Sequence, residues 1–204
     1  MNIEGLVISL PAILLALSVH EFAHGYMAYR LGDMTPKYQG RLTLNPLAHL
    51  DLIGTIMLIF VHFGWAKPVM VNPGNFRVDQ KKGMLYVALA GPLSNVLLAL
   101  IAGILYNLLI KMNVSYFWIL LVQFLIIINV NLAVFNLIPV PPLDGSKILA
   151  GLLPYKMHNL IYQLEAYGPI ILILLLVTNV FGIILGPLVG GLLDIIMGIS
   201  NFII

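Results

Sequence analysis

The chain of 204 residues is 61% hydrophobic and only 9% charged, and its 10 Lys or Arg and 8 Asp or Glu residues leave a formal net charge of +2. A soluble domain carries about 25% charged residues, so this chain cannot cover a water-soluble fold with polar surface. The small, dispersed charge argues against a nucleic-acid partner, and the absence of cysteine excludes disulfides and Cys-ligated metals. We therefore expect an integral, multi-pass membrane protein with the lipid bilayer as its surroundings.

Charged residues divide the chain into apolar segments, and a membrane-spanning helix needs about 20 such residues. The first segment starts at Gly5 with no basic region before it and no small-residue cleavage site after it, so we expect it to be retained. Residues 51–65 are apolar but short, which favours a re-entrant insertion. Charge-free stretches follow at 84–110, 112–143 and 166–193, the last interrupted by glycine and proline. We expect four or five spans and one partial insertion.

The sequence HEFAH at residues 20–24 places two histidines and a glutamate inside the first apolar segment. Residues four apart share one face of a helix, so His20 and His24 can direct their imidazole nitrogens at one divalent cation. Glu21 in this pattern is the general base, which takes a proton from the attacking water and passes it to the leaving amine. Ionisable groups within a membrane are costly and mark functional sites. The pattern predicts a zinc hydrolase.

A catalytic zinc ion has three protein ligands and one open position, so a third ligand is expected elsewhere. The candidates are Glu4, Asp33, His49, Asp51, His62, Asp79, Asp144, His158, Glu165 and Asp194. Asp144 is favoured because three prolines in residues 136–145 exclude regular helix and Gly145 permits a sharp turn. Such backbone at membrane depth is buried in protein or lines a wet cavity. The alternative is that Asp144 caps a helix beginning near Ser146.

Three motifs in this order resemble the site-2 protease family of intramembrane zinc metalloproteases. They are HEFAH at 20–24, AGPLSN at 90–95 and NLIPVPPLDG at 136–145. The resemblance implies one zinc ion per chain, held by His20, His24 and Asp144, with Glu21 as the catalytic base.

Two asparagines also match the motifs of this family. Asn136 corresponds to the asparagine expected near the developing oxyanion, and Asn95 to a middle-helix asparagine whose role is left open. Relatives often carry a PDZ or CBS domain. This chain resembles the compact form without either domain.

We expect an all-α polytopic membrane protein with a three-helix catalytic core and accessory helices. A single domain covers residues 1–204, with the core at about 5–150 and accessory helices at about 157–204. Residues 38–44 alternate polar and apolar side chains, which predicts a short membrane-associated β element after the first helix. The edge of that element could pair with a substrate strand. The alternative is an ordinary interfacial loop.

Basic residues predict the orientation, because Lys and Arg are enriched in cytoplasmic loops. They follow the first helix and precede the span at 84–110: Arg30, Lys37, Arg41, Lys81 and Lys82. Both flanks are therefore expected on the cytoplasmic side of the cell membrane, with the metal-binding residues near that face. This arrangement requires residues 51–65 to enter and return. A tilted full span there would invert everything that follows.

The activity that the resemblance implies is hydrolysis of peptide bonds in or near transmembrane segments of another membrane protein. One alternative is a membrane metal transporter, which has no need of Glu21 beside the ligands. A catalytically silent scaffold would normally have lost one of the four key residues. A CAAX-type protease would take a downstream glutamate as its ligand, and Glu165 is the candidate.

Overall fold

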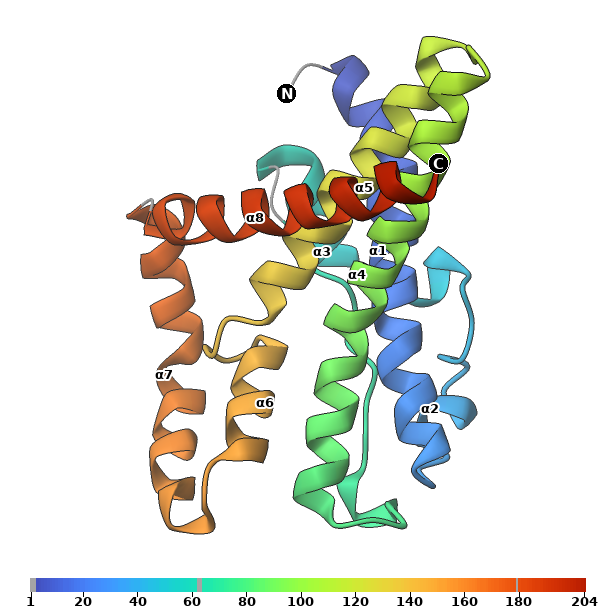
Figure 1. The fold of residues 1–204 in the computed structure, drawn as a ribbon. Coiled ribbons are helices and arrows are strands. Elements are labelled where there is room, and N and C mark those ends of the chain that lie inside the picture. The colour runs from blue at the N-terminus through green and yellow to red at the C-terminus, as the bar shows by residue number, and fades with distance from the viewer. Residues whose placement is uncertain (1–2, 62–63, 179) are drawn as a thin grey trace.

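The computed structural model consists of helices joined by turns and by one long irregular stretch (Figure 1). The structure describes residues 3–61, 64–178 and 180–204. The α-helices are α1 (Ile3–Arg30), α2 (Thr35–Tyr38), α3 (Leu52–Val61), α4 (Gln80–Lys111), α5 (Tyr116–Asn136), α6 (Asp144–Leu152), α7 (His158–Val177) and α8 (Val180–Ile203). The 3-10 helices are η1 (Pro46–Ala48), η2 (Pro73–Asn75) and η3 (Tyr155–Met157). No strand occurs in these ranges, which confirms the all-α class.

Helices α1, α4 and α5 form the centre of the molecule, where each packs against the other two. Along the chain α1 descends in the view of Figure 1, α4 ascends beside it and α5 descends again. Each of the three helices carries buried alanines: Ala16 and Ala28 on α1, Ala99 and Ala102 on α4, and Ala133 on α5. Small side chains let helix backbones approach closely, which is how helices associate when lipid provides no hydrophobic driving force.

Four helices within the described ranges are long and apolar enough to cross a membrane: Ile8–Arg30, Gln80–Lys111, Tyr116–Asn136 and Gly182–Ile203. The last of these belongs to α8, which runs across α4 and α5 instead of alongside them (Figure 1). The crossing is close because Gly103 has no side chain. A Cβ there would lie 3.3 Å from Ser200 Cβ and 3.4 Å from Ile196 Cγ2. Ile196 thereby joins the core of α4 and α5.

The loop after α1 does not contain the β element predicted at residues 38–44. Helix α2 ends with Gly40 at a φ of +66° and with the N–H of Arg41 donating to Pro36 O at 2.9 Å, a Schellman motif that turns the chain. The buried Arg41 side chain then donates to the carbonyl of Ala48. The alternating pattern was misleading because Arg41 points inward to hold the next loop.

A segment without helix or turn lies further along the chain, at residues 66–72. Ala66 forms an isolated antiparallel bridge with Leu50, and the N–H of Lys67 donates to His49 O at 2.8 Å. Leu50, just before the 10-residue helix α3, and Ala66, after that helix, therefore lie next to each other. We refer to residues 66–77, which run from this bridge to shortly before α4, as the tethered segment.

Candidate metal centre

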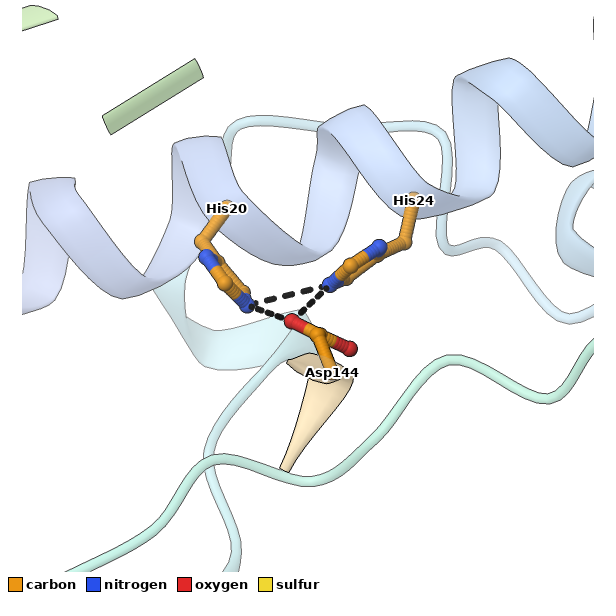
Figure 2. Close-up of side chains that lie close together, drawn as sticks. All are labelled: His20, His24 and Asp144. Carbon is orange, nitrogen blue, oxygen red and sulfur yellow. Dashed lines mark hydrogen bonds and ion pairs between the residues drawn. The ribbon is translucent and has the colours of Figure 1, made fainter. Parts of the chain in front are cut away.

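His20 and His24 on α1 converge with Asp144 at the start of α6 (Figure 2). The two Nε2 atoms lie 3.0 Å apart, and Asp144 Oδ2 lies 3.2 Å from the first and 3.1 Å from the second. All three residues are buried. In the part of the chain that the structure describes, they are the one group of three His, Asp or Glu side chains close enough to share a metal ion.

The opposite nitrogen of each imidazole has its own partner. His24 Nδ1 lies 2.7 Å from the carbonyl oxygen of Val87, and His20 Nδ1 lies 2.6 Å from Asn95 Oδ1, both on α4. These oxygens only accept, so each Nδ1 carries a proton and each Nε2 is the nitrogen that faces Asp144. Two imidazole nitrogens and a carboxylate oxygen this close together need a positive charge between them, which a metal ion or a proton on Nε2 supplies. Two imidazole nitrogens and one carboxylate oxygen suit zinc.

Gly91 on α4 provides the space for the two imidazoles. A Cβ at this position would lie 2.6 Å from the Cε1 atoms of both His20 and His24, and closer still to His24 Nε2. Any side chain here would therefore fill the space around the converging nitrogens. Gly91 belongs to the AGPLSN motif, so the sequence marked the motif, but it did not predict that Gly91 makes room for the imidazoles.

The proline-rich loop after α5 aims Asp144 at the histidines. Leu143 donates its N–H to Val140 O at 3.0 Å, and α6 begins at Asp144 itself with Leu143 in the N-cap position. Asp144 is therefore not the helix cap that the sequence left open as an alternative. Gly145 is needed for close approach, because a Cβ there would lie 2.5 Å from the carbonyl carbon of Ile138.

Glu21 lies beside the cluster and contacts the tethered segment. Its Oε2 accepts a hydrogen bond of 3.0 Å from the backbone N–H of Val69. The Val69 side chain packs over Gly25, one turn further along α1, where a Cβ would lie 3.4 Å from Val69 Cγ1. The structure thus brings one backbone donor to the carboxylate that the sequence predicts as the base.

The two predicted asparagines occupy different places. Asn95 is fully buried on α4 and contacts His20. Asn136 is half-buried at the end of α5, and its Nδ2 donates to Leu132 O of the same helix at 3.0 Å. Among the described residues, its amide makes no hydrogen bond to the three clustered side chains.

The other candidate ligands whose side chains are described lie outside the cluster. Three carboxylates, those of Asp33, Asp51 and Asp79, accept hydrogen bonds from backbone N–H groups at turns or helix starts. His49 Nε2 donates to Thr43 O. The remaining two carboxylates, Glu165 and Asp194, are exposed. His62 lies outside the described residues, as do the side chains of Glu4 and His158.

Sequence reasoning missed three contributors to the site: the carbonyl of Val87, the N–H of Val69 and the side chain of Asn129, which contacts Asn95. Every residue has a backbone carbonyl and most have an N–H, so no pattern of side chains reveals the first two. Asn129 did carry a signal, since it is a polar residue in an apolar span.

The sequence matches the model of peptidase family M50 over residues 110–178. It is also 40% identical to YwhC of Bacillus subtilis (strain 168) over 201 residues, which cover 94% of this chain and 90% of that protein. The chain belongs to peptidase family M50. The resemblance to the site-2 proteases is thereby confirmed.

Further relatives show similarity at lower identity. Rip2 of Mycolicibacterium smegmatis is 31% identical over 81% of this chain and 64% of its own length. MJ0611 of Methanocaldococcus jannaschii is 32% identical over 70% of this chain and 69% of its own length. YwhC, Rip2 and MJ0611 each bear the name "putative zinc metalloprotease". No solved structure matches this M50 chain.

Proposed function

We propose that this M50 protein is an intramembrane zinc metalloprotease that hydrolyses peptide bonds in or near transmembrane segments of other membrane proteins. The observation that carries the proposal is the buried convergence of His20 Nε2, His24 Nε2 and Asp144 Oδ2 within 3.2 Å. One zinc ion per chain would be held by these three residues. The names of the relatives support the same assignment.

The chain's own residues supply the proton transfers of hydrolysis. Zinc, when bound, contributes Lewis acidity toward the scissile carbonyl and the attacking water. Glu21 takes a proton from the water as the new C–O bond forms, and the proton passes to the amide nitrogen as the C–N bond breaks. The products are a carboxylic acid and an amine. The N–H of Val69 holds one oxygen of Glu21, which supports a fixed orientation for this base.

Asn136 completes the proposal as a donor to the developing oxyanion. It lies on the segment that leads into the Asp144 loop, and one of its two amide hydrogens already points to Leu132 O. For Asn136 to donate to the oxyanion, either the loop between α5 and α6 changes its conformation, or the second N–H of the Asn136 amide reaches the substrate. Asn95 acts on His20 instead of on the substrate, as its 2.6 Å contact supports.

We assign part of the substrate route to a cavity of about 690 Å³, whose wall comes within one helical turn of residues at the candidate centre. It opens between the stretch before α4, the start of α4, α6 and α7, with Met84 one turn before Val87 and Lys147 one turn after Asp144 on its wall. Glu165 lines the same cavity, which supports a place along the substrate route instead of the metal ligation of a CAAX-type enzyme.

The proposed location is the cell membrane, with the catalytic centre near the cytoplasmic face. The bridge between Leu50 and Ala66 supports a re-entrant course for residues 51–65, because it brings together the two residues that flank this stretch. The chain after α1 and the chain before α4 also lie at the same end of the molecule (Figure 1). Both carry the basic residues that favour the cytoplasmic side.

The experiment that tests this function compares the wild-type protein with Glu21→Gln. The glutamine keeps the size of the side chain but cannot act as a base, so we expect a folded protein that holds zinc and does not cleave. Both proteins are purified, their zinc content is measured, and they are incubated with a panel of single-span substrates with and without a zinc chelator. Appreciable cleavage by Glu21→Gln would refute the assignment of Glu21 as the general base. Movement of zinc across the membrane without cleavage would favour a transporter.

The same assay tests Asn136. Losing one oxyanion donor costs about 10²–10³ in kcat, so Asn136→Ala is expected to keep its zinc while kcat falls far more than KM changes. Asn136→Asp is expected to be slower still, because it adds negative charge near the oxyanion. Loss of zinc and thermal stability in step with activity would instead assign Asn136 to the helix end.

A further inference from the structure

Asn129 is a fully buried polar residue on the apolar helix α5, and it belongs to none of the three sequence motifs. Its Nδ2 donates to Leu125 O of its own helix at 2.8 Å, and its Oδ1 accepts from Asn95 Nδ2 at 2.7 Å. Asn95 Oδ1 in turn lies 2.6 Å from His20 Nδ1. One line of hydrogen bonds therefore runs from α5 through α4 to the candidate metal centre on α1.

Backbone carbonyls fix the direction of every hydrogen bond in this line, because they only accept. Leu125 O requires Nδ2 of Asn129 to face its own helix. Ala16 O, 3.2 Å from Asn95 Nδ2, requires the Asn95 nitrogen to face away from His20. Asn95 thus presents its oxygen to His20, so Nδ1 carries the imidazole proton. The lone pair on Nε2 is left for the metal.

We propose that Asn129 is a positioning residue of the metal centre, which acts through Asn95 to hold His20 in the tautomer that binds zinc. The proposal rests on the zinc site proposed above. Without the Asn129 oxygen, one N–H of Asn95 is buried with no partner, which is costly where water is excluded. The Asn95 amide is then less firmly held. An amide that has turned over would donate to His20 Nδ1 and move the imidazole proton to Nε2.

Asn131 provides a matched control two residues along the same helix. Its Nδ2 donates to Ile127 O at 2.7 Å, the same bond to its own helix that Asn129 makes to Leu125. Asn131 is exposed, and two residues along an α-helix turn its side chain to nearly the opposite side from Asn129. Asn131→Leu therefore removes the same local hydrogen bond without touching the line to His20. Val130→Ala serves as a second control, because Val130 is fully buried and its truncation lowers stability through packing alone.

The test measures zinc affinity by chelator competition and the absorption spectrum of the cobalt-substituted protein. Partners that orient a ligating histidine are typically worth 10- to 100-fold in metal affinity, so Asn129→Leu is expected to weaken zinc binding about tenfold or more and to change the cobalt spectrum. Asn131→Leu and Val130→Ala are expected to keep the wild-type spectrum and affinity. Thermal unfolding of the metal-free proteins shows how much of each effect is lost stability.

A double-mutant cycle with Asn95→Ala tests whether Asn129 acts through Asn95. If it does, Asn129→Leu has little further effect on zinc affinity once Asn95 is gone. Additive losses, or an Asn129→Leu protein with wild-type zinc affinity and spectrum, overturn the proposal. A wild-type protein that binds no zinc overturns the proposed function as well. Zinc binding without proteolysis contradicts the proposed function alone, because none of these readouts depends on cleavage.

Discussion

At the scale of single residues, the site depends on the groups that orient the two histidines as much as on the histidines themselves. His20 and His24 could be predicted because four residues make one helical turn, and Asp144 because prolines make its loop stiff. The partners of their Nδ1 atoms, Asn95 and Val87 O, come from another helix. That helix is placed by tertiary packing, which local sequence patterns do not reveal.

Gly91 leads to a prediction about space at the metal. Gly91→Ala places a methyl group against both imidazoles, and overpacking of this kind costs about 1–3 kcal/mol. Zinc affinity is therefore expected to fall about tenfold or more, as measured by chelator competition. Gly198→Ala is the matched control, because nothing lies within 4 Å of its added Cβ and α8 should accept it. Equal zinc affinity in the two variants would contradict the packing around Gly91.

At the scale of elements, the tethered segment is the feature that the sequence did not predict. The pattern at residues 38–44 suggested an extended element beside α1, whereas the tethered segment contacts Glu21. A pattern of alternating polar and apolar side chains is compatible with a strand and with a folded loop. Here the positive φ of Gly40 and the inward-pointing Arg41 side chain produce a loop. The contact of Val69 with Glu21 joins residues 48 positions apart. Local patterns carry no information about such pairings.

Asp33 fastens the tethered segment to the end of α1. Its fully buried carboxylate accepts from the N–H and hydroxyl of Thr35, from the N–H of Asn72 at 2.7 Å and from Asn75 Nδ2 at 2.9 Å. Burial alone would raise the pKa of the Asp33 carboxyl, but these hydrogen bonds outweigh burial and hold the pKa below its usual range. Asp33 therefore stays ionised and keeps the segment against α1, near Glu21.

Replacing Asp33 should loosen the base without removing the metal. In Asp33→Asn the new amide has only one oxygen for these four donors, and a lost hydrogen bond to a charged group costs about 1.5–3 kcal/mol. Hydrogen exchange of the Val69 amide is expected to rise about tenfold or more, with lower kcat and unchanged zinc content. Asp79→Asn, which keeps an oxygen for the start of α4, is the control. Unchanged exchange at Val69 would refute the role of Asp33.

At the scale of the whole molecule, the membrane class followed from composition, and the all-α class followed from the lengths of the charge-free segments and from the resemblance to the site-2 proteases. The course of α8 did not, because length and hydropathy describe a span while its packing across α4 and α5 depends on Gly103 and Ser200. Likewise, the short stretch at residues 51–65 could be interpreted either as a re-entrant insertion or as a tilted span. The bridge between Leu50 and Ala66 favours the first.

Cysteine labelling tests the orientation of the whole chain. The protein contains no cysteine, so single cysteines can be introduced without other changes. Those at Lys37 and Lys81 are expected to react with a membrane-impermeant thiol reagent only after the cytoplasmic side is opened. A cysteine at Asn113, between α4 and α5, should react from outside. Labelling of positions 37 and 81 from opposite sides would mean that residues 51–65 cross the membrane.

The measurement that tests the central claim most directly is the zinc content of the purified protein and of its ligand variants. We predict one zinc ion per wild-type chain, and little or none in His24→Ala and Asp144→Ala preparations that remain helical by circular dichroism. Asp194→Ala, which removes an exposed carboxylate on α8, should keep its zinc. A wild-type chain without zinc, or His24→Ala and Asp144→Ala proteins that both keep it, would contradict a zinc centre built from His20, His24 and Asp144.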